Sequence, residues 1–437
     1  MCGIAGFCNF KEDFEENTDY WNFRLEKMRA VLAHRGNDAR GRYLKKHIGL
    51  SHSRLAIRDI LCGDQPMTRT HNGYDYTICY NGEIYNTDEL IPELSENGFV
   101  CSTTSDTEVI LYAYIHWGAD FVNRLNGIFA FAIWDAAKSR LLLYRDRVGV
   151  KPLFYAIRGD SLVFGSEPKA CFAHPAVKPE LDKQGLQELL AIGPAHTSGL
   201  SLFKDLFEVL PGHFMIYSRD GLHDETYWEL TSREHTESYR DTVAHTRFLV
   251  EDAIKRQMVS DVPVCTFLSG GIDSSIVTAI AANYMNTRGK TLNTFSFDFK
   301  DNDRYFKANA FQPERDLPYV NRMLEEYETA HSYLECDENS LFKALFAAVD
   351  AKDMPGMTDV DSSLLYFCSL VSRKNKVALT GECADEIFGG YPWFYRKELL
   401  ERYGFPWSSD VAPRLALLHD DVGLAVSYTH LTLPTKA

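Results

Sequence analysis

The hydrophobic pattern of this chain changes near residue 241, and this change limits the fold more than any other feature. Before it, short apolar and β-branched runs at 76–80, 127–134 and 140–145 are bounded by Asn-Gly or charged clusters, a pattern typical of strands joined by turns. After it, strand-like runs alternate with segments of helical period, which predicts βαβ units and a parallel sheet. With 437 residues the chain is also too long for one ordinary domain. We therefore expect two domains of different fold class.

The same patterns place individual elements. Helical periodicity at 22–32 and 106–117 accompanies the early strands, so we expect a layered α+β domain in which helices cover sheets. Later in the chain we expect helices at 242–258, 273–285 and 362–372, and strands at 262–268, 292–299 and 376–380. The predicted boundaries are a first domain at 2–218, a linker at 219–241, a second domain at 242–424 and a final segment at 425–437.

Composition narrows the class of protein. The formal charge of −15 argues against nucleic-acid binding, which usually shows as a basic stripe. The N-terminus lacks the basic flank and long apolar run of a signal peptide, and no stretch approaches the ~18 apolar residues of a membrane helix. None of the ten cysteines forms a close CxxC pair, so nine of them are expected to be buried thiols in a reducing cytosol. We expect a cytoplasmic protein.

The final segment, 425–437, does not continue the helical, charged pattern before it. It resembles a translated cloning junction more than the end of a domain, and a short native strand is the alternative. The fold prediction leaves it out.

Cys2 stands directly after the initiator methionine and is followed by GIAG. Removal of Met1 would place a free α-amino group, with a reference pKa near ~8, on the same residue as a thiol. An adjacent general base is what a thiol nucleophile needs. A cysteine at position 2 is more often an ordinary residue, so the segments that follow decide its role.

Three further segments offer partners for such a nucleophile. SRLAI contains Arg54, whose guanidinium can grip an α-carboxylate through two parallel hydrogen bonds. YNGEIYN contains Asn81 and Gly82, a side-chain amide and a backbone N–H able to stabilise an oxyanion, although Asn-Gly alone also fits a hairpin turn. In TTSDTEVI, Asp106 is equally suited to capping a helix and to pairing with an ammonium group.

Together with HRGNDARG, NGIFAFAIWD and RDRVGVKPLFY, these segments follow the order found in class II glutamine amidotransferases, and residues 2–218 resemble that family. The resemblance implies an αββα sandwich of the N-terminal nucleophile hydrolase type. It implies that Cys2 attacks the glutamine side-chain amide while Asn81 and Gly82 form the oxyanion hole. For Arg54 and Glu83, an ordinary surface ion pair is the alternative role. The positions implied to bind glutamine are Arg54, Leu55, Ala56, Ile57, Arg58, Asn81, Gly82, Glu83 and Asp106.

A second motif, SGGIDSS, follows the strand predicted at 262–268 and precedes a predicted helix. Two glycines let backbone N–H groups approach an anion, three serine hydroxyls can donate hydrogen bonds, and the helix N-terminus adds the positive end of its dipole. It lacks the GK[ST] of a Walker loop, and a plain Gly-Gly turn is the alternative.

This motif resembles the pyrophosphate loop of ATP pyrophosphatases, and LTGECADEIFGGY resembles their partner motif. The resemblance implies an α/β parallel-sheet domain that cleaves ATP to AMP and pyrophosphate. Asp273 and Asp385 would be hard oxygen ligands for Mg²⁺, with helix capping or solvation as their alternative role, and Glu382 is tied to forming the acyl-adenylate. The implied ATP-binding positions are Leu268, Ser269, Gly270, Gly271, Asp273, Ser274, Ser275, Phe297, Thr380 and Gly381.

A glutaminase followed by these two motifs is the arrangement of glutamine-hydrolysing asparagine synthetases, which the whole chain resembles. The resemblance implies that glutamine, ATP and aspartate are substrates and that aspartate is activated as β-aspartyl-AMP. Ammonia must then arrive unprotonated and shielded from water. Homodimers are common in the family.

Two departures from the family pattern leave alternatives open. Family members continue beyond the second motif with a lysine-bearing segment that has no match after 400–424, so we expect a shortened synthetase. Segments 298–320 and 355–363 fit a branch in which some members amidate other carboxylates. The alternatives are therefore a cell-wall precursor or natural-product intermediate as acceptor, and a chain that acts only as a glutaminase or binding module.

Overall fold

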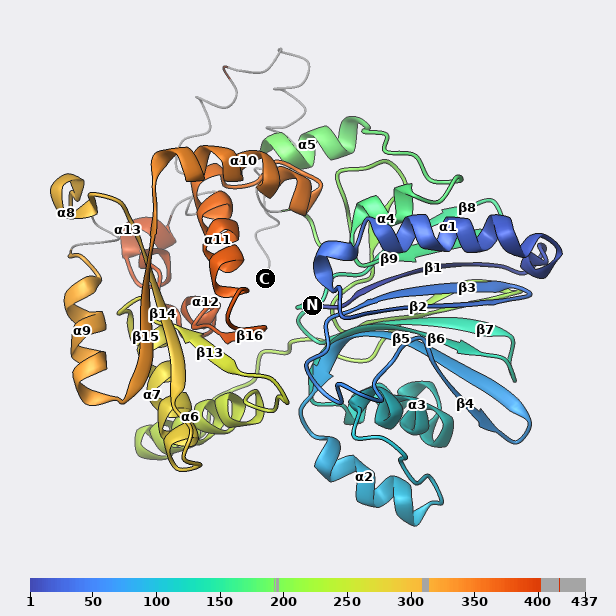
Figure 1. The fold of residues 1–437 in the computed structure, drawn as a ribbon, viewed down its shortest axis with the longest axis horizontal. Helices are drawn as coiled ribbons and strands as arrows, with labels where there is room; N and C mark the ends of the chain where they lie inside the picture. The colour runs from blue at the N-terminus through green and yellow to red at the C-terminus, as the bar shows by residue number, and fades with distance from the viewer. Residues whose placement is uncertain (192, 194–195, 309–313, 402–415, 417–437) are drawn as a thin grey trace. The chain divides into compact units, whose positions relative to one another are not determined.

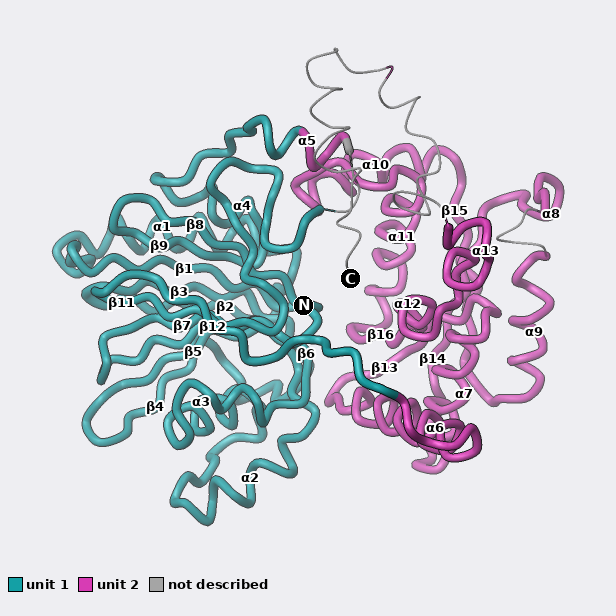
Figure 2. Tube along the Cα trace, turned by 180° about the vertical axis from the view of Figure 1, so that it is seen from behind, with its two compact units in different colours: residues 1–186, 196–234 teal, residues 187–195, 235–437 magenta. Residues whose placement is uncertain are grey.

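The computed structural model describes residues 1–191, 193, 196–308, 314–401 and 416. The chain forms two compact units, residues 1–186 with 196–234 and residues 187–195 with 235–437 (Figure 2). The predicted final segment at 425–437 lies outside the described residues.

Unit 1 is built on two six-stranded antiparallel sheets (Figure 1). The first sheet, in spatial order, is β10 (Phe207–Glu208), β8 (Phe154–Arg158), β9 (Ser161–Gly165), β1 (Gly3–Asn9), β3 (Ile48–Arg54) and β2 (Ala39–Lys45). The second is β12 (Gly221–Thr226), β11 (His213–Ser218), β7 (Arg140–Arg145), β6 (Gly127–Asp135), β5 (Tyr74–Ile84) and β4 (Met67–His71).

Helices cover the outer faces of these sheets, and three clusters of buried side chains fill the spaces between layers. One cluster lies between the sheets and joins Ile4 and Leu50 to Ala132 and Leu143. A second packs α1 (Thr18–Ala30) and α4 (Pro168–Phe172) on the first sheet, and a third packs α2 (Thr87–Glu96) and α3 (Asp106–Trp117) on the second. The predicted αββα sandwich is confirmed. Short 3₁₀ helices lie at η1 (Phe14–Asn17), η2 (Ala33–Arg35) and η3 (Ala119–Arg124), and α5 (Lys183–Ala191) follows α4.

Unit 2 contains a four-stranded parallel sheet with helices between its strands, which confirms the predicted α/β class. The strand order is β15 (Thr329–Cys336), β14 (Leu292–Phe299), β13 (Val264–Phe267) and β16 (Val377–Leu379). Its helices are α6 (Tyr239–Arg256), α7 (Ile272–Asn286), α8 (Asn302–Tyr305), α9 (Leu317–Glu326), α10 (Glu338–Lys352), α11 (Thr358–Val371), α12 (Ala384–Phe388), η4 (Pro392–Phe394) and α13 (Lys397–Leu400). No described helix has the length and apolar character needed to cross a membrane.

Two expectations differ from the structure. Residues 221–226 of the predicted linker form β12, because a two-residue turn at Arg219 and Asp220 folds them back onto β11 as a hairpin, and Gly221, with φ of 108°, begins the returning strand. All ten cysteines are free, but four of the nine that were expected to be buried are not: Cys62 and Cys383 are exposed, and Cys101 and Cys368 are half-buried. Cys62 lies in the loop after β3, and Cys383 precedes the short helix α12 in the left-handed region.

Candidate active sites

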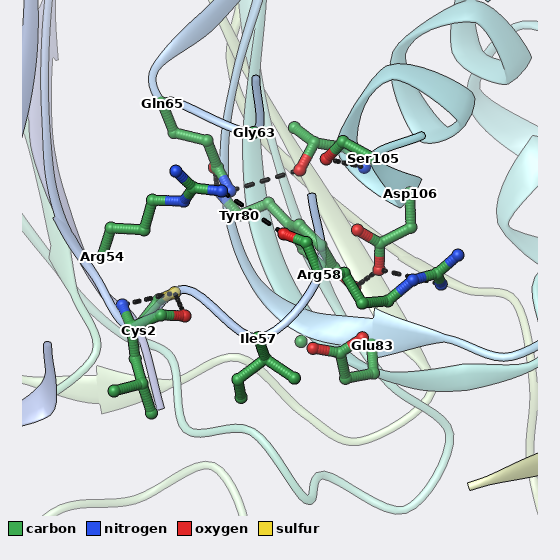
Figure 3. A pocket seen from close by; sticks show the side chains of 13 residues that line it. Cys2, Arg54, Ile57, Arg58, Gly63, Gln65, Tyr80, Glu83, Ser105 and Asp106 are labelled. Carbon is green, nitrogen blue, oxygen red and sulfur yellow. Dashed lines mark hydrogen bonds and ion pairs between the residues drawn. The ribbon is translucent and has the colours of Figure 1, made fainter. Parts of the chain in front are cut away.

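A pocket in unit 1 brings together side chains from the chain start, the loop after β3, strand β5 and the start of α3. Figure 3 shows Cys2 and Arg54 at one end and Arg58, Glu83 and Asp106 at the other. The residues that line it are Cys2, Arg54, Leu55, Ile57, Arg58, Gly63, Gln65, Tyr80, Gly82, Glu83, Ser105, Asp106 and Thr107. Seven of the nine positions expected to bind glutamine therefore meet in one place, the exceptions being Ala56 and Asn81.

The Cys2 thiol is held by the backbone of Leu55. The Leu55 N–H donates to the sulfur over 3.4 Å, and the thiol faces the Leu55 carbonyl at 3.6 Å. The Arg35 Nε fixes the Cys2 carbonyl at 2.9 Å, immediately before β1 begins. Burial raises the pKa of the thiol above its ordinary value. A neutral, well-positioned thiol needs a base to become a nucleophile.

Met1 is 51% exposed as a residue, but its α-amino group beside this thiol is largely shielded from solvent. Burial, with smaller contributions from Arg35 and Lys151, lowers the pKa of the Met1 α-amino group to about 5. An amino group in these surroundings is neutral at pH 7 and can accept a proton. If Met1 is removed, the new α-amino group belongs to Cys2, the residue that carries the thiol.

Asn81 and Gly82 lie inside β5, which excludes the hairpin-turn alternative for this Asn-Gly pair. Asn81 is 1% exposed, and its Nδ2 has no hydrogen-bond partner among the described residues. A buried amide donor without an acceptor costs about 1–3 kcal/mol, so such groups are rare unless a ligand completes them. A Cβ on Gly82 would meet the Ile128 carbonyl oxygen at 2.3 Å, so only glycine permits this close approach of β5 and β6.

Arg54 is buried, and its guanidinium closes the loop that follows β3. It donates to the carbonyl oxygens of Arg58, Asp59 and Ile60 at 3.3, 2.5 and 3.2 Å, and to Asp64 Oδ1 at 3.0 Å. This is not the surface ion pair considered as its alternative, because the Arg54 side chain is only 6% exposed. To grip a substrate carboxylate, Arg54 must exchange at least one of these bonds.

Asp106 lies in the first turn of α3, but Ser105 caps that helix by accepting from the Thr107 N–H at 3.3 Å. The capping alternative for Asp106 is therefore wrong. Its carboxylate accepts from the Tyr80 hydroxyl at 2.8 Å and the Ile84 N–H at 3.0 Å, and Arg58 lies 4.0 Å away. Burial raises the pKa of Asp106 despite the Arg58 charge. A buried carboxylate in this position suits a substrate ammonium group.

In unit 2, the SGGIDSS loop joins β13 to α7, as predicted for an anion-binding loop. Gly270 has a φ of 86°, and Gly271 is the N-cap residue of α7. Ser274 Oγ accepts from the Ser269 N–H at 3.2 Å and lies 3.0 Å from the Ser269 hydroxyl. The loop therefore wraps the start of a fifteen-residue helix, where backbone N–H groups are unsatisfied.

The second motif meets this loop where β16 ends. A Cβ on Gly381 would lie 2.7 Å from the Ser274 nitrogen and 2.8 Å from the Asp273 carbonyl carbon, so only glycine fits. Burial and the nearby Asp385 carboxylate raise the pKa of Asp273. Mutual repulsion of this kind is what a divalent cation relieves, and two carboxylates suit Mg²⁺ when phosphate and water supply its other ligands. No group of three or more His, Cys, Asp or Glu side chains in the described residues could hold a metal alone.

Comparison with known proteins assigns each half of the chain to a family. Residues 1–228 match the glutamine amidotransferase domain family, and residues 245–432 match the asparagine synthase family. The chain is 48% identical over 421 residues to asparagine synthetase [glutamine-hydrolyzing] 3 of Bacillus subtilis, covering 96% of this chain and 68% of that protein. The chain belongs to the glutamine-hydrolysing asparagine synthetase family.

Other relatives of this asparagine synthetase family member are more distant. A putative asparagine synthetase 2 of Methanocaldococcus jannaschii is 32% identical, with 90% of this chain and 76% of the relative covered. The amidase chyE of Penicillium rubens is also 32% identical, with 93% and 61% covered. The chain spans 60% of the length of the Bacillus subtilis asparagine synthetase 1. A solved glutamine phosphoribosylpyrophosphate amidotransferase of the same bacterium aligns with a TM-score of 0.40 at 16% identity, covering 91% of this chain and 98% of that chain.

The other positions that were expected to serve the synthetase lie on the strands and loops next to SGGIDSS and to the segment after β16. Leu268 is buried and its N–H donates to the Phe295 carbonyl at 2.8 Å, whereas Thr380 and Glu382 are exposed beyond β16. Phe297 packs on Phe367 of α11 with ring centroids 5.2 Å apart, which gives it a structural role in the hydrophobic core of this synthetase unit.

The sequence patterns did not indicate five residues that line the glutaminase pocket: Gly63, Gln65, Tyr80, Ser105 and Thr107. Gln65 connects two walls of the pocket, since its Oε1 accepts from the Tyr80 N–H at 2.6 Å and its Nε2 donates to Thr107 at 3.3 Å. Tyr80, Ser105 and Thr107 stand inside the motifs YNGEIYN and TTSDTEVI, directly beside predicted site residues, but their residue types alone did not mark them as part of the site. Gln65 stands in no motif and depends on the tertiary fold.

Proposed function

We propose that this chain hydrolyses glutamine at the Cys2 pocket and uses the ammonia to amidate aspartate that unit 2 has activated with ATP. The proposal of glutamine hydrolysis rests on one observation: the thiol of the half-buried Cys2 shares its pocket with Arg54, Glu83 and Asp106, groups of the charge needed to hold an amino acid by both its ends. The ATP half rests on the contact of two glycine-bearing loops at the start of α7.

The glutaminase chemistry follows from the groups present. After removal of Met1, the α-amino group of Cys2 accepts the thiol proton, and the sulfur attacks the side-chain amide carbon of glutamine. The Asn81 Nδ2 and the Gly82 N–H are proposed to stabilise the oxyanion. The carbon–nitrogen bond then breaks, the α-ammonium returns its proton to the leaving nitrogen, and ammonia departs. Water hydrolyses the thioester to glutamate and restores the thiol.

The synthetase chemistry needs an activated carboxylate. The proposed step transfers AMP to the β-carboxylate of aspartate and releases pyrophosphate, after which ammonia displaces AMP. Asp273 and Asp385 would hold Mg²⁺, which neutralises phosphate charge when bound. The N-terminal N–H groups of α7 and the hydroxyls of Ser269 and Ser275 are proposed to hold the phosphates.

Incubation with glutamine alone tests the first half. Glutamate release should be seen in the wild type and lost in Cys2→Ala, because no other group in the proposed mechanism supplies the nucleophile. Cys62→Ala is the matched control, since it removes an exposed thiol that does not line the pocket. Equal release by Cys2→Ala and wild type would overturn the proposal. Intact mass spectrometry should show that Met1 is absent from the active protein.

The acceptor is tested by pyrophosphate release, which should require aspartate. A second acceptor class is raised by one comparison, the amidase chyE at 32% identity. We place aspartate first because the asparagine synthetase of Bacillus subtilis is 48% identical over 96% of the chain. If other carboxylates trigger pyrophosphate release and aspartate does not, the asparagine assignment fails. Homodimer formation and a cytoplasmic location stay predictions.

A further inference from the structure

Lys151 is a buried cation that the proposed glutaminase mechanism does not use. It is 9% exposed and lies at the end of the loop that follows β7. Asp146, itself 1% exposed, fixes this loop by accepting from the N–H groups of Val148, Val150 and Lys151 at 3.2, 2.9 and 3.0 Å. The backbone of Lys151 is therefore fixed, and its side chain is buried rather than extended into solvent. Burying a charged lysine costs free energy, so lysines are rarely buried unless a partner or a function compensates.

The Lys151 side chain contacts Met1, the residue whose removal the proposed mechanism requires. Its Nζ lies 3.2 Å from the Met1 sulfur, and an Arg35 guanidinium nitrogen lies 4.0 Å from the same atom. A thioether is a weak acceptor for an ammonium group. Removal of Met1 takes this poor partner away and leaves two cations beside the new N-terminus.

Charged groups from several elements face that terminus. Arg35 of η2 and Lys151 both favour the neutral form of the amino group, while the Cys2 thiol and Glu83 of β5 favour the charged form. Burial, and then Arg35, lower the pKa of Lys151 itself. Because Arg35 is already engaged with the Cys2 carbonyl and with Glu167 at 2.6 Å, Lys151 is the cation whose effect on the nucleophile can be isolated.

We propose that Lys151 is a positioning residue for the nucleophile, whose ammonium lies on the side that Met1 vacates and keeps the new α-amino group of Cys2 in its neutral, proton-accepting form. This rests on the proposed glutaminase function. It assigns to Lys151 an electrostatic role through the general base, without contact with the reacting atoms.

The test is the pH dependence of kcat/KM for glutamine hydrolysis. In Lys151→Met, loss of the cation should move the acidic limb of the profile upward by about one pH unit, so that activity well below the midpoint of the limb falls about tenfold while activity well above it is little affected. Lys151→Arg should keep the limb at its wild-type position. Lys138→Met removes an exposed lysine of the β6–β7 turn and should leave the profile unchanged. If the acidic limb of the kcat/KM profile does not move in Lys151→Met, or moves by the same amount in Lys151→Arg, the inference is overturned.

A second measurement separates this inference from the proposed function. The rate at which iodoacetamide alkylates Cys2, followed by mass spectrometry at each pH, does not require turnover. Lys151→Met should shift this profile upward as well, because the ammonium favours the thiolate. No glutamate release by the wild type overturns the proposed function alone, whereas an unshifted alkylation profile overturns the role of Lys151. Equal melting temperatures of the wild type and the three variants would exclude a folding defect as the cause of a shift.

Discussion

At the scale of single residues, Asn81 is the group whose state in the structure is hardest to explain without a ligand. Its amide nitrogen is buried and has no acceptor in the described part of the chain. Asn81→Ala should lower kcat for glutamine hydrolysis by about 10²–10³-fold, the usual effect of removing one oxyanion donor. It should leave the melting temperature unchanged or higher, because the variant removes an unsatisfied buried group.

Asn86 provides the matched comparison for Asn81. It is also buried, but its Oδ1 accepts from the Asn126 N–H at 2.8 Å and its Nδ2 donates to the Arg124 carbonyl at 3.0 Å. Asn86→Ala should therefore lower stability by about 1–3 kcal/mol and affect kcat little. If instead Asn81→Ala lowers the melting temperature and keeps kcat, its amide is structural and the oxyanion role is lost.

The motifs and the family resemblance were enough to predict most of the residues that line the glutaminase pocket. The residues and contacts that were not predicted have physical explanations. Cys2 was singled out as a thiol that could share its residue with a general base, whereas Asp106 fitted a helix cap equally well until the family resemblance implied a role in binding glutamine. The contacts of Arg54 were not predictable, since carbonyl oxygens of a loop carry no residue-type signal. Gln65 was missed because it reaches the pocket only through the pairing of distant segments.

At the scale of elements, the meeting of two loops at the start of α7 depends on Gly381. In Gly381→Ala the new carbon would press on backbone atoms of Asp273 and Ser274 at 2.8 and 2.7 Å, and backbone cannot rotate away. We expect at least about a tenfold loss of ATP affinity in calorimetry, with glutamine hydrolysis retained. In Gly271→Ala the added carbon meets only Ser269 Oγ at 3.5 Å, so it is the milder comparison. Equal ATP affinity of Gly381→Ala and wild type would show that the loops tolerate separation.

Strand and helix patterns predicted elements well where burial was strong. The helix expected at 106–117 and the strand expected at 292–299 have the predicted limits. β15 was not expected because its residues are mostly half-buried or exposed, so it lacks a clear apolar face. α10 was missed as well, and its Phe342 and Phe346 are 62% and 67% exposed. Tertiary pairing with β14 forms β15, and one segment's pattern does not contain that information.

At the scale of the whole molecule, buried histidines make the fold of unit 1 sensitive to acid. Burial lowers the pKa of His52 and of His174 to about 4. Between pH 6.5 and 4 the unfolded chain therefore binds protons that the folded unit does not, and stability falls as the pH falls. Each histidine should cost about 2 kcal/mol of unfolding free energy at pH 5 relative to pH 7. The raised pKa of Asp106 acts in the opposite direction, so the histidine contribution must be isolated by substitution.

His174→Phe isolates that contribution. The ring stacks on Trp21 at 5.8 Å and lies 5.1 Å from Phe7, so phenylalanine keeps the aromatic packing and removes the titrating group. It also removes the acceptor for the Ala176 N–H at 3.3 Å, a loss that is the same at every pH. The variant should therefore start slightly less stable at pH 7 and lose less stability by pH 5 than the wild type, in urea unfolding measured at both pH values. Parallel losses in the two proteins would mean that His174 is protonated in the folded unit and that its burial does not govern the acid response.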